Sequence, residues 1–191
     1  LFAYRLNSME LDVLRPILIT LIDPTEVAVP QGELEKAVSV IESWMVRRLL
    51  VRATNKNYNK LVVEMVQVVN KDREHAGTRL EKYFSEQSSV SSYWPDDVEL
   101  SGFVSQMQIY RNLYRSRIRM ILEALEDHSR GWIGGETSKS GTRMKRGSFA
   151  IEHIMPRSWK SHWPLPKAVN ELERDKEVHT LGNLTLLSSK L

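Results

Sequence analysis

The chain has 191 residues, of which 41% are apolar and 27% are charged, and this composition is typical of a soluble globular protein with a sizeable core. Its net charge of +3 permits a polyanionic partner but does not establish one. The sequence contains no cysteine, which excludes disulfides and thiolate zinc sites, so a bound metal would need ligands from His, Asp, Glu or Asn.

The most apolar stretch, residues 13–29, contains Arg15, Asp23 and two prolines, so we do not expect it to span a bilayer. No leader of basic and then apolar residues stands at the N-terminus, and the chain begins with Leu1 instead of Met. We interpret the sequence as a piece of a longer cytoplasmic protein.

Apolar residues recur with helical spacing from the N-terminal region to about His128. The i, i+3, i+4, i+7 pattern is clearest in three segments: residues 34–49, 61–69 and 103–125. Pro24 and Pro30 bracket a connection, and a serine-rich loop covers residues 85–97. We therefore predict a mainly α protein in which residues 1–128 form a helical bundle.

Residues 129–148 differ in composition, because they are rich in glycine, serine, threonine and basic residues. We predict a basic linker loop here, which separates the bundle from a C-terminal element over residues 149–191. That element is expected to begin with a strand that ends at Pro156 and to continue through a connection with a helical turn near residues 169–176. A second strand in "LGNLTLL" and the first turn of a helix near Ser188 would follow.

A Glu-His pair, Glu152 and His153, stands inside the apolar run "FAIEHIMPRSW". Burial of a carboxylate and an imidazole is costly unless both groups have partners. The pair therefore either bonds to itself and the backbone at a strand end or lines a site. Neighbouring side chains point to opposite faces of a regular strand, so both can serve one site only where the strand ends. Pro156 is consistent with such an end.

The pair and the "LGNLTLL" segment about thirty residues later together resemble the ββα-metal element of His-Me finger (HNH-like) nucleases. With "WMVRRLLVRATNKNYNKL" upstream, the sequence resembles more narrowly the C-terminal nuclease domain of GmrSD-type and SspE-type modification-dependent restriction proteins. This resemblance implies a helical bundle followed by a small finger, and a metal-dependent endonuclease that nicks DNA in phage defence. It also implies an NTPase or modification-sensing domain of the same protein before Leu1.

The resemblance, rather than the spacing, assigns the roles of the site residues. His153 would be the general base that activates water, and Glu152 would be a ligand of a divalent metal, Mg²⁺ or Mn²⁺. Asn183 would be a catalytic-site residue that braces the loop and orients His153, although a simple turn Asn after Gly182 is the alternative. The chemistry agrees with these roles, since the pKa of His lies near neutrality and hard oxygen ligands suit Mg²⁺.

The sequence departs from the family's pattern at its C-terminal end. The last metal ligand of the family, an Asn or a His, lies on a helix about nine residues after the middle Asn. Here the sequence ends at Leu191, eight residues after Asn183. We therefore expect the finger to be incomplete at the C-terminus, without its final helix and one of its ligands.

Basic residues gather in three parts of the sequence, each of which is either a solvated surface or a phosphate-binding surface. One is the acid-free segment of residues 43–63, a second is the arginine-rich segment of residues 111–119, and the third is the linker, with Lys139 among its cations. The residues predicted to contact DNA are Arg143, Lys145, Arg146, Arg157, Arg47 and Arg48. His162 and His179, which flank the connection between the two strands, either contact phosphate or metal or are structural.

A DNA endonuclease is thus the function that the sequence favours. The alternative from another class is a non-catalytic DNA-binding or interaction module with a degenerate finger, and a helical regulatory domain is a third reading. Metal-dependent nicking that requires His153 distinguishes the first from the others, whereas DNA binding without metal dependence favours the second.

Overall fold

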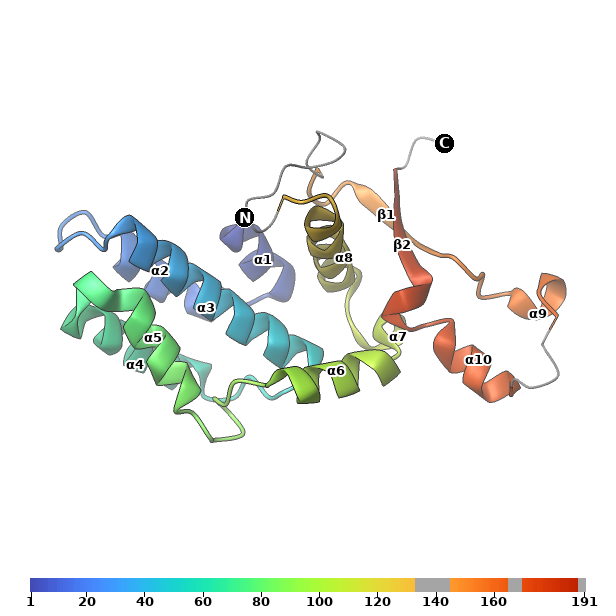
Figure 1. The fold of residues 1–191 in the computed structure, drawn as a ribbon, viewed down its shortest axis with the longest axis horizontal. Coiled ribbons are helices and arrows are strands. Elements are labelled where there is room, and N and C mark those ends of the chain that lie inside the picture. Colours follow the sequence, from blue (N-terminus) through green and yellow to red (C-terminus); the bar gives the residue numbers. More distant parts are fainter. Residues whose placement is uncertain (133–144, 165–169, 189–191) are drawn as a thin grey trace. The chain divides into compact units, whose positions relative to one another are not determined.

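The computed structural model describes residues 1–132, 145–164 and 170–188. These residues are mainly helical and carry a two-stranded sheet near the C-terminus, which confirms the predicted fold class (Figure 1). In chain order the elements are α1 (Phe2–Met9), η1 (Asp12–Leu14), α2 (Arg15–Ile22), α3 (Gln31–Leu50), α4 (Tyr58–Lys71), η2 (Arg73–His75), α5 (Ala76–Ser85), α6 (Asp97–Gln106), α7 (Ile109–Asn112), α8 (Arg115–Ser129), β1 (Phe149–His153), α9 (Trp159–His162), α10 (Glu171–Glu177), η3 (Leu181–Asn183) and β2 (Leu184–Ser188).

The chain divides into two compact units, residues 1–103 and residues 104–191, and each is described by itself. This division places α8 in the same unit as the strands. The segment boundaries expected from composition, after residues 128 and 148, stay a prediction.

The first unit is built from helices whose predicted apolar stripes form a common core. Helix α3 packs against α5, and α4 packs against both α5 and α2 (Figure 1). The close approach of α3 and α5 depends on Gly77, because a Cβ at this position would lie 2.5 Å from the carbonyl oxygen of Glu33. Beside this contact, the buried rings of Trp44 and Phe84 stack with their centroids 4.9 Å apart.

The second unit is organised around the two strands. Strands β1 and β2 pair antiparallel from Phe149 opposite Ser188 to His153 opposite Leu184. Helix α8 packs against both strands, and α7 packs against α8 (Figure 1). The apolar side of α8, with Ile118 fully buried, supplies the core of this unit.

The helical pattern predicted over residues 103–125 is interrupted twice, between α6 and α7 and between α7 and α8. Gln108 and Tyr114 leave the helical conformation, with ψ values of 72° and 149°. The backbone N–H of Tyr110 on α7 donates to the carbonyl oxygen of His179 at 3.1 Å. This long-range hydrogen bond brings α7 to the residues that lie just before β2.

Among the residues that the structure describes, no helix combines the length and the apolarity needed to cross a bilayer.

Candidate active site

The Glu-His pair lies at the end of a strand, as the sequence predicts. Strand β1 ends at His153, which pairs with Leu184 at the last position of the ladder. Glu152 is exposed and His153 is half-buried, which follows from the alternation of side chains on a strand. The carboxylate thus faces solvent, whereas the imidazole lies against the protein.

Asn183 fixes the backbone that follows β1. Its Oδ1 accepts a hydrogen bond from the backbone N–H of Met155 at 2.8 Å, and its Nδ2 donates to the carbonyl oxygen of Met155 at 3.0 Å. The same Nδ2 donates to the carbonyl oxygen of Val178 at 2.8 Å, and the Asn183 carbonyl accepts from the N–H of Ile154 at 2.9 Å. These bonds hold the two residues after His153, and they are the contacts that a bracing role requires.

Replacement of Asn183 by Ala is expected to lower the free energy of unfolding and to slow nicking as well. The variant leaves the paired N–H and carbonyl groups of Met155 without a side-chain partner, which costs about 1–3 kcal/mol. Asn170 offers a matched control, because it caps α10 by accepting from the N–H of Leu172 at 2.8 Å. Asn170→Ala should cost about 0.5–2 kcal/mol without slowing nicking. Equal nicking by both variants in a plasmid assay would make Asn183 a turn residue only.

Three aromatic rings meet at the end of β1. The ring centroid of Tyr110 lies 4.3 Å from that of His153, and the two rings meet edge to face. The His179 ring lies 5.6 Å from the His153 ring and stacks on Tyr110 at 5.9 Å. Because α7 is held to His179 by its backbone hydrogen bond, this arrangement fixes one side of the His153 imidazole.

Burial and neighbouring positive charges lower the pKa of both imidazoles. Burial is the main cause that lowers the pKa of His153, and His179 and the Arg157 guanidinium lower this pKa further, against the opposing effect of Glu152. Burial likewise lowers the pKa of His179. Within the described part of the chain, Nε2 of His153 and Nδ1 of His179 are buried without a hydrogen-bond partner. A neutral imidazole has one nitrogen that can accept a proton, and which nitrogen this is depends on the tautomer.

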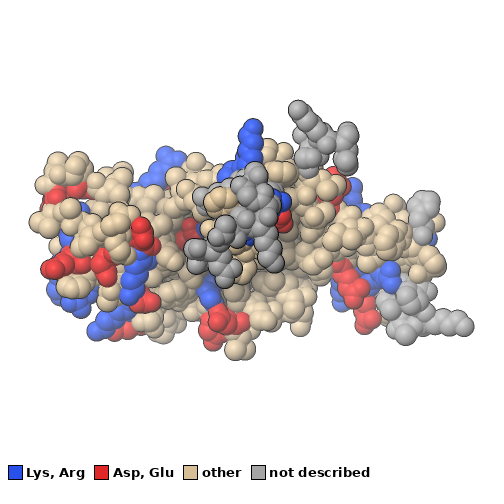
Figure 2. Space-filling view, turned by 45° about the horizontal axis from the view of Figure 1, so that its top comes forward, with Lys and Arg blue, Asp and Glu red and all other residues tan. Residues whose placement is uncertain are grey.

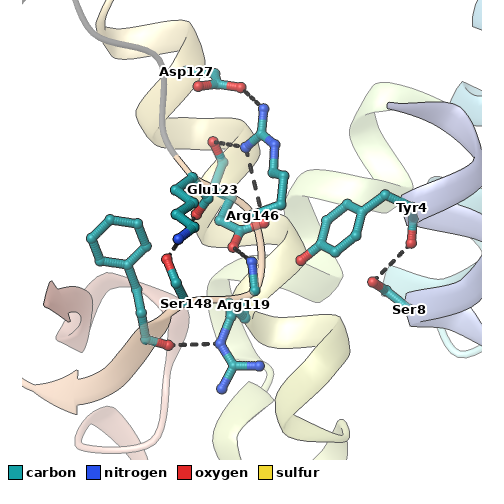
Figure 3. A network of polar contacts seen from close by, with 10 residues as sticks. Tyr4, Ser8, Arg119, Glu123, Asp127, Arg146 and Ser148 are labelled. Atoms are coloured by element: carbon teal, nitrogen blue, oxygen red, sulfur yellow. Dashed lines mark hydrogen bonds and ion pairs between the residues drawn. The ribbon is translucent and has the colours of Figure 1, made fainter. Parts of the chain in front are cut away.

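Arg146, one of the predicted DNA contacts, lies before β1 and forms polar contacts with Glu123 and Asp127 of α8 (Figure 3). Its guanidinium pairs with Asp127 and lies 3.9 Å from a carboxylate oxygen of Glu123. The other oxygen of Glu123 accepts from the N–H of Gly147 at 2.7 Å, and Gly147 has a left-handed φ of 71° that glycine adopts without strain. Arg119 donates to the carbonyl oxygen of Phe149 at 2.7 Å. The network therefore fixes the start of β1, and it leaves Arg146 little freedom to bind phosphate.

Arg48 is a structural residue rather than a DNA contact. It is 1% exposed, and its guanidinium donates to the Tyr58 hydroxyl and to the carbonyl oxygens of Thr54, Val90 and Tyr93. A guanidinium buried in this way is not accessible to a phosphate of the DNA backbone. The sequence pattern missed this because a helix carries core and surface arginines in the same acid-free run.

The other predicted DNA contacts lie in different settings. Arg47 is paired with Asp97 and also donates to the carbonyl oxygen of Pro95 at 3.1 Å. Lys145 and Arg157 are exposed. Arg143 and Lys139 lie outside the described residues, and so does the side chain of His162. DNA binding by these residues stays a prediction.

The structure also brings together residues that the sequence did not assign to the site. Tyr110 was predicted as one member of an apolar helical stripe, whereas it contacts both imidazoles. Arg111 and Arg115 flank it, and the guanidinium carbon of Arg115 lies 3.4 Å from the Tyr110 ring centroid. The acid-free segment that contains these arginines suggested a phosphate-binding surface from the sequence alone. Its position near the end of β1 depends on the interruption of the helix, which the sequence did not predict.

The predicted metal site is represented among the described residues by one carboxylate, that of Glu152. No group of three or more His, Asp or Glu side chains that could hold a metal ion occurs within residues 1–132, 145–164 and 170–188. The motif contributes Glu152, an exposed carboxylate of the kind that Mg²⁺ and Mn²⁺ bind. Further ligands would have to come from water, from substrate or from outside the described residues.

The comparison with known families agrees with the architecture of the second unit. Residues 94–191 match a family model whose description is "GmrSD restriction endonucleases, C-terminal domain". The match covers more than half of the chain, including the whole second unit, and the chain belongs to this family. No curated protein and no solved structure matches the chain. The family is one of restriction endonucleases, for which DNA is the substrate.

Proposed function

We propose that this chain is a metal-dependent DNA endonuclease domain of the His-Me finger (HNH-like) type, which nicks DNA within a restriction protein directed against phage. The observation that carries the proposal is the strand-end pair of Glu152 and His153, whose following backbone is held by Asn183. Membership of the GmrSD C-terminal family supports the nuclease class.

In this mechanism His153 acts as the general base. Its lowered pKa keeps the imidazole neutral at pH 7, so the ring accepts the proton of a water molecule as the water oxygen attacks phosphorus. One P–O ester bond then breaks, and the nicked strand leaves with that oxygen. Asn183 keeps the backbone after His153 in place, while Tyr110 and His179 restrict the orientation of the ring.

Glu152 is the residue of the motif that would hold a divalent cation, because its carboxylate is exposed and directly precedes the base in β1. Phosphodiester cleavage builds negative charge on the departing oxygen, and a bound Mg²⁺ or Mn²⁺ would stabilise this charge. Mg²⁺ keeps several water ligands in most protein sites, so a single motif carboxylate within the described residues is compatible with binding.

The metal requirement is tested with supercoiled plasmid and the full-length protein. We expect open circles to form with Mg²⁺ or Mn²⁺ and not with EDTA. Glu152→Gln should need a higher metal concentration for half-maximal nicking, since the variant loses a charged oxygen ligand. Glu173→Gln is the matched control, because this glutamate is an exposed residue of α10.

Two results would count against the proposal. Nicking that persists in EDTA would remove the metal from the mechanism. DNA binding by a protein that shows no nicking under any metal condition would favour a non-catalytic DNA-binding module.

A further inference from the structure

A cleft of about 990 Å³ opens in the second unit beside the His153 ring cluster. Its walls come from α7, from the start of α8, from the residues after β1 and from the end of α10. The residues that line it are Tyr110, Arg111, Leu113, Tyr114, Arg115, Arg157, Ser158, Asp175, Val178 and His179. We propose that this cleft, called here the arginine cleft, binds a phosphate of the DNA backbone next to the one that is cut; this inference rests on the proposed nuclease function.

Unpaired positive charge is the first argument. Arg111, Arg115 and Arg157 are exposed, and none of them forms an ion pair with a carboxylate among the described residues. The acid in the cleft, Asp175, accepts from Nε1 of Trp159 at 2.9 Å and lies 3.9 Å from Nζ of Lys160. The cleft therefore keeps an excess of cationic groups facing solvent, which favours a polyanion.

The face drawn in Figure 2 shows no such excess, because basic and acidic side chains are interspersed over its described part. Other arginines of the described residues are paired with carboxylates, as Arg47 is with Asp97 and Arg130 is with Glu126. The unpaired arginines of the cleft are therefore distinct from these.

The arginines of the cleft are held in place while they keep donors free. Arg115 donates from Nη1 to the carbonyl oxygen of Tyr110 at 2.5 Å and rests on the ring of that residue. Arg111 donates from Nη1 to Oε1 of Gln108 at 2.9 Å. A guanidinium has five N–H donors, so each of these contacts leaves others for phosphate oxygens. Such anchoring lowers the conformational entropy that binding would otherwise cost.

A buried polar group also lines the cleft. His179 is 8% exposed, and its Nδ1 has no hydrogen-bond partner within the described part of the chain. A buried polar atom without a partner is unusual in a folded protein and is explained when a ligand supplies the partner.

The position and size of the cleft fit a nucleotide unit beside the scissile one. Tyr110 and His179 line the cleft and also contact the His153 ring, so the cleft and the proposed base share two walls. A volume near 990 Å³ is at the upper end of ordinary ligand pockets and exceeds what one phosphate needs. A strand whose cleaved phosphate reaches His153 would place a neighbouring phosphate among the arginines.

The test measures DNA binding without cleavage, in EDTA, by fluorescence anisotropy of a short labelled duplex with full-length protein. The double variant Arg111→Gln, Arg115→Gln should weaken binding equally for unrelated sequences. The plot of log K against log salt has a negative slope, and the magnitude of this slope should decrease by about two, which is roughly one unit for each lost phosphate contact. A control with the same charge change, Lys71→Gln, Lys82→Gln, alters exposed residues of the first unit that lie outside the three basic segments, and it should leave the slope unchanged.

Further arms separate folding, ligand source and catalysis. The single variant Arg111→Gln, which removes a side chain that is exposed and hydrogen-bonded to Gln108, should reduce the magnitude of the slope by about one with an unchanged melting temperature. The anisotropy measurement in EDTA contains no cleavage step, so a failure of the nuclease mechanism leaves this test intact. An unchanged slope in both arginine variants would overturn the proposal. A second result would also overturn it: ATP displaces the labelled duplex, and the arginine variants bind DNA as the wild type does. That result would indicate a site for free nucleotides.

Discussion

His153→Ala is expected to abolish detectable nicking by the full-length protein while the fold survives. A general base contributes about 10²- to 10⁴-fold to a reaction of this kind, so removal of the imidazole should lower the nicking rate by at least that range. The side chain is half-buried, and Nε2 has no partner among the described residues, so few favourable contacts are lost. Supercoiled plasmid with Mg²⁺ or Mn²⁺, scored for open circles over time, measures the effect.

The stability of the variant separates a catalytic histidine from a structural one. We expect the melting temperature to fall by less than about 5 °C, because the deletion leaves only a small gap against Tyr110 and His179. His128→Ala serves as the control, since His128 is an exposed residue at the end of α8. Wild-type nicking by His153→Ala would remove this residue from the mechanism. A larger fall in melting temperature together with slow nicking would favour a strand-end histidine that stabilises the fold.

Sequence periodicity predicted the strands and the longer helices because each buries one continuous face. Residues 34–49 and 61–69 correspond to α3 and α4, and the apolar run before Pro156 forms β1. The sequence placed the end of the first strand at Pro156, and β1 ends three residues earlier, at His153. The expectation that Asn183 braces the loop and orients His153 came from the resemblance to His-Me finger nucleases, since no local pattern shows it.

Contacts between distant segments limited what the sequence could predict. A periodic pattern over residues 103–125 gives no sign that the helix breaks at Gln108 and Tyr114, because the break is compensated by the hydrogen bond from Tyr110 to His179. Phe103 and Leu125, which the pattern places on this apolar stripe, are 47% and 48% exposed. The break places Arg111 and Arg115 in the arginine cleft, which no local pattern shows.

Charge runs were a poor guide to function for a related reason. Arg48 and Arg146 stand among other cations in the sequence, yet Arg48 donates to carbonyl oxygens in a core and Arg146 pairs with carboxylates of α8. Those acids are far away in the sequence, so a scan for acid-free segments cannot see them. Burial of the partner decides whether an arginine is available for DNA, and burial depends on the tertiary fold.

The Arg146 network gives the largest expected effect on stability. Glu123 and Asp127 have side chains that are 0% exposed, and the side chain of Arg146 is 20% exposed. Arg146→Ala leaves two buried carboxylates without this guanidinium, and a broken buried pair costs about 3–5 kcal/mol. Lys145→Ala, a change of an exposed neighbour, should stay within about 0.5 kcal/mol.

Because the chain has two compact units, this loss is best measured locally. Hydrogen exchange of the amides of β1 and α8 should speed up strongly in Arg146→Ala, whereas exchange in α3 and α5 should change little. The double variant Arg146→Ala, Asp127→Asn should recover part of the protection, since it also removes one uncompensated charge. The slope of log K against log salt for DNA binding should remain that of the wild type, because the guanidinium of Arg146 is paired with Asp127 inside the unit. If the magnitude of this slope decreased by about one while hydrogen exchange stayed unchanged, Arg146 would instead be a DNA contact, as the sequence predicted.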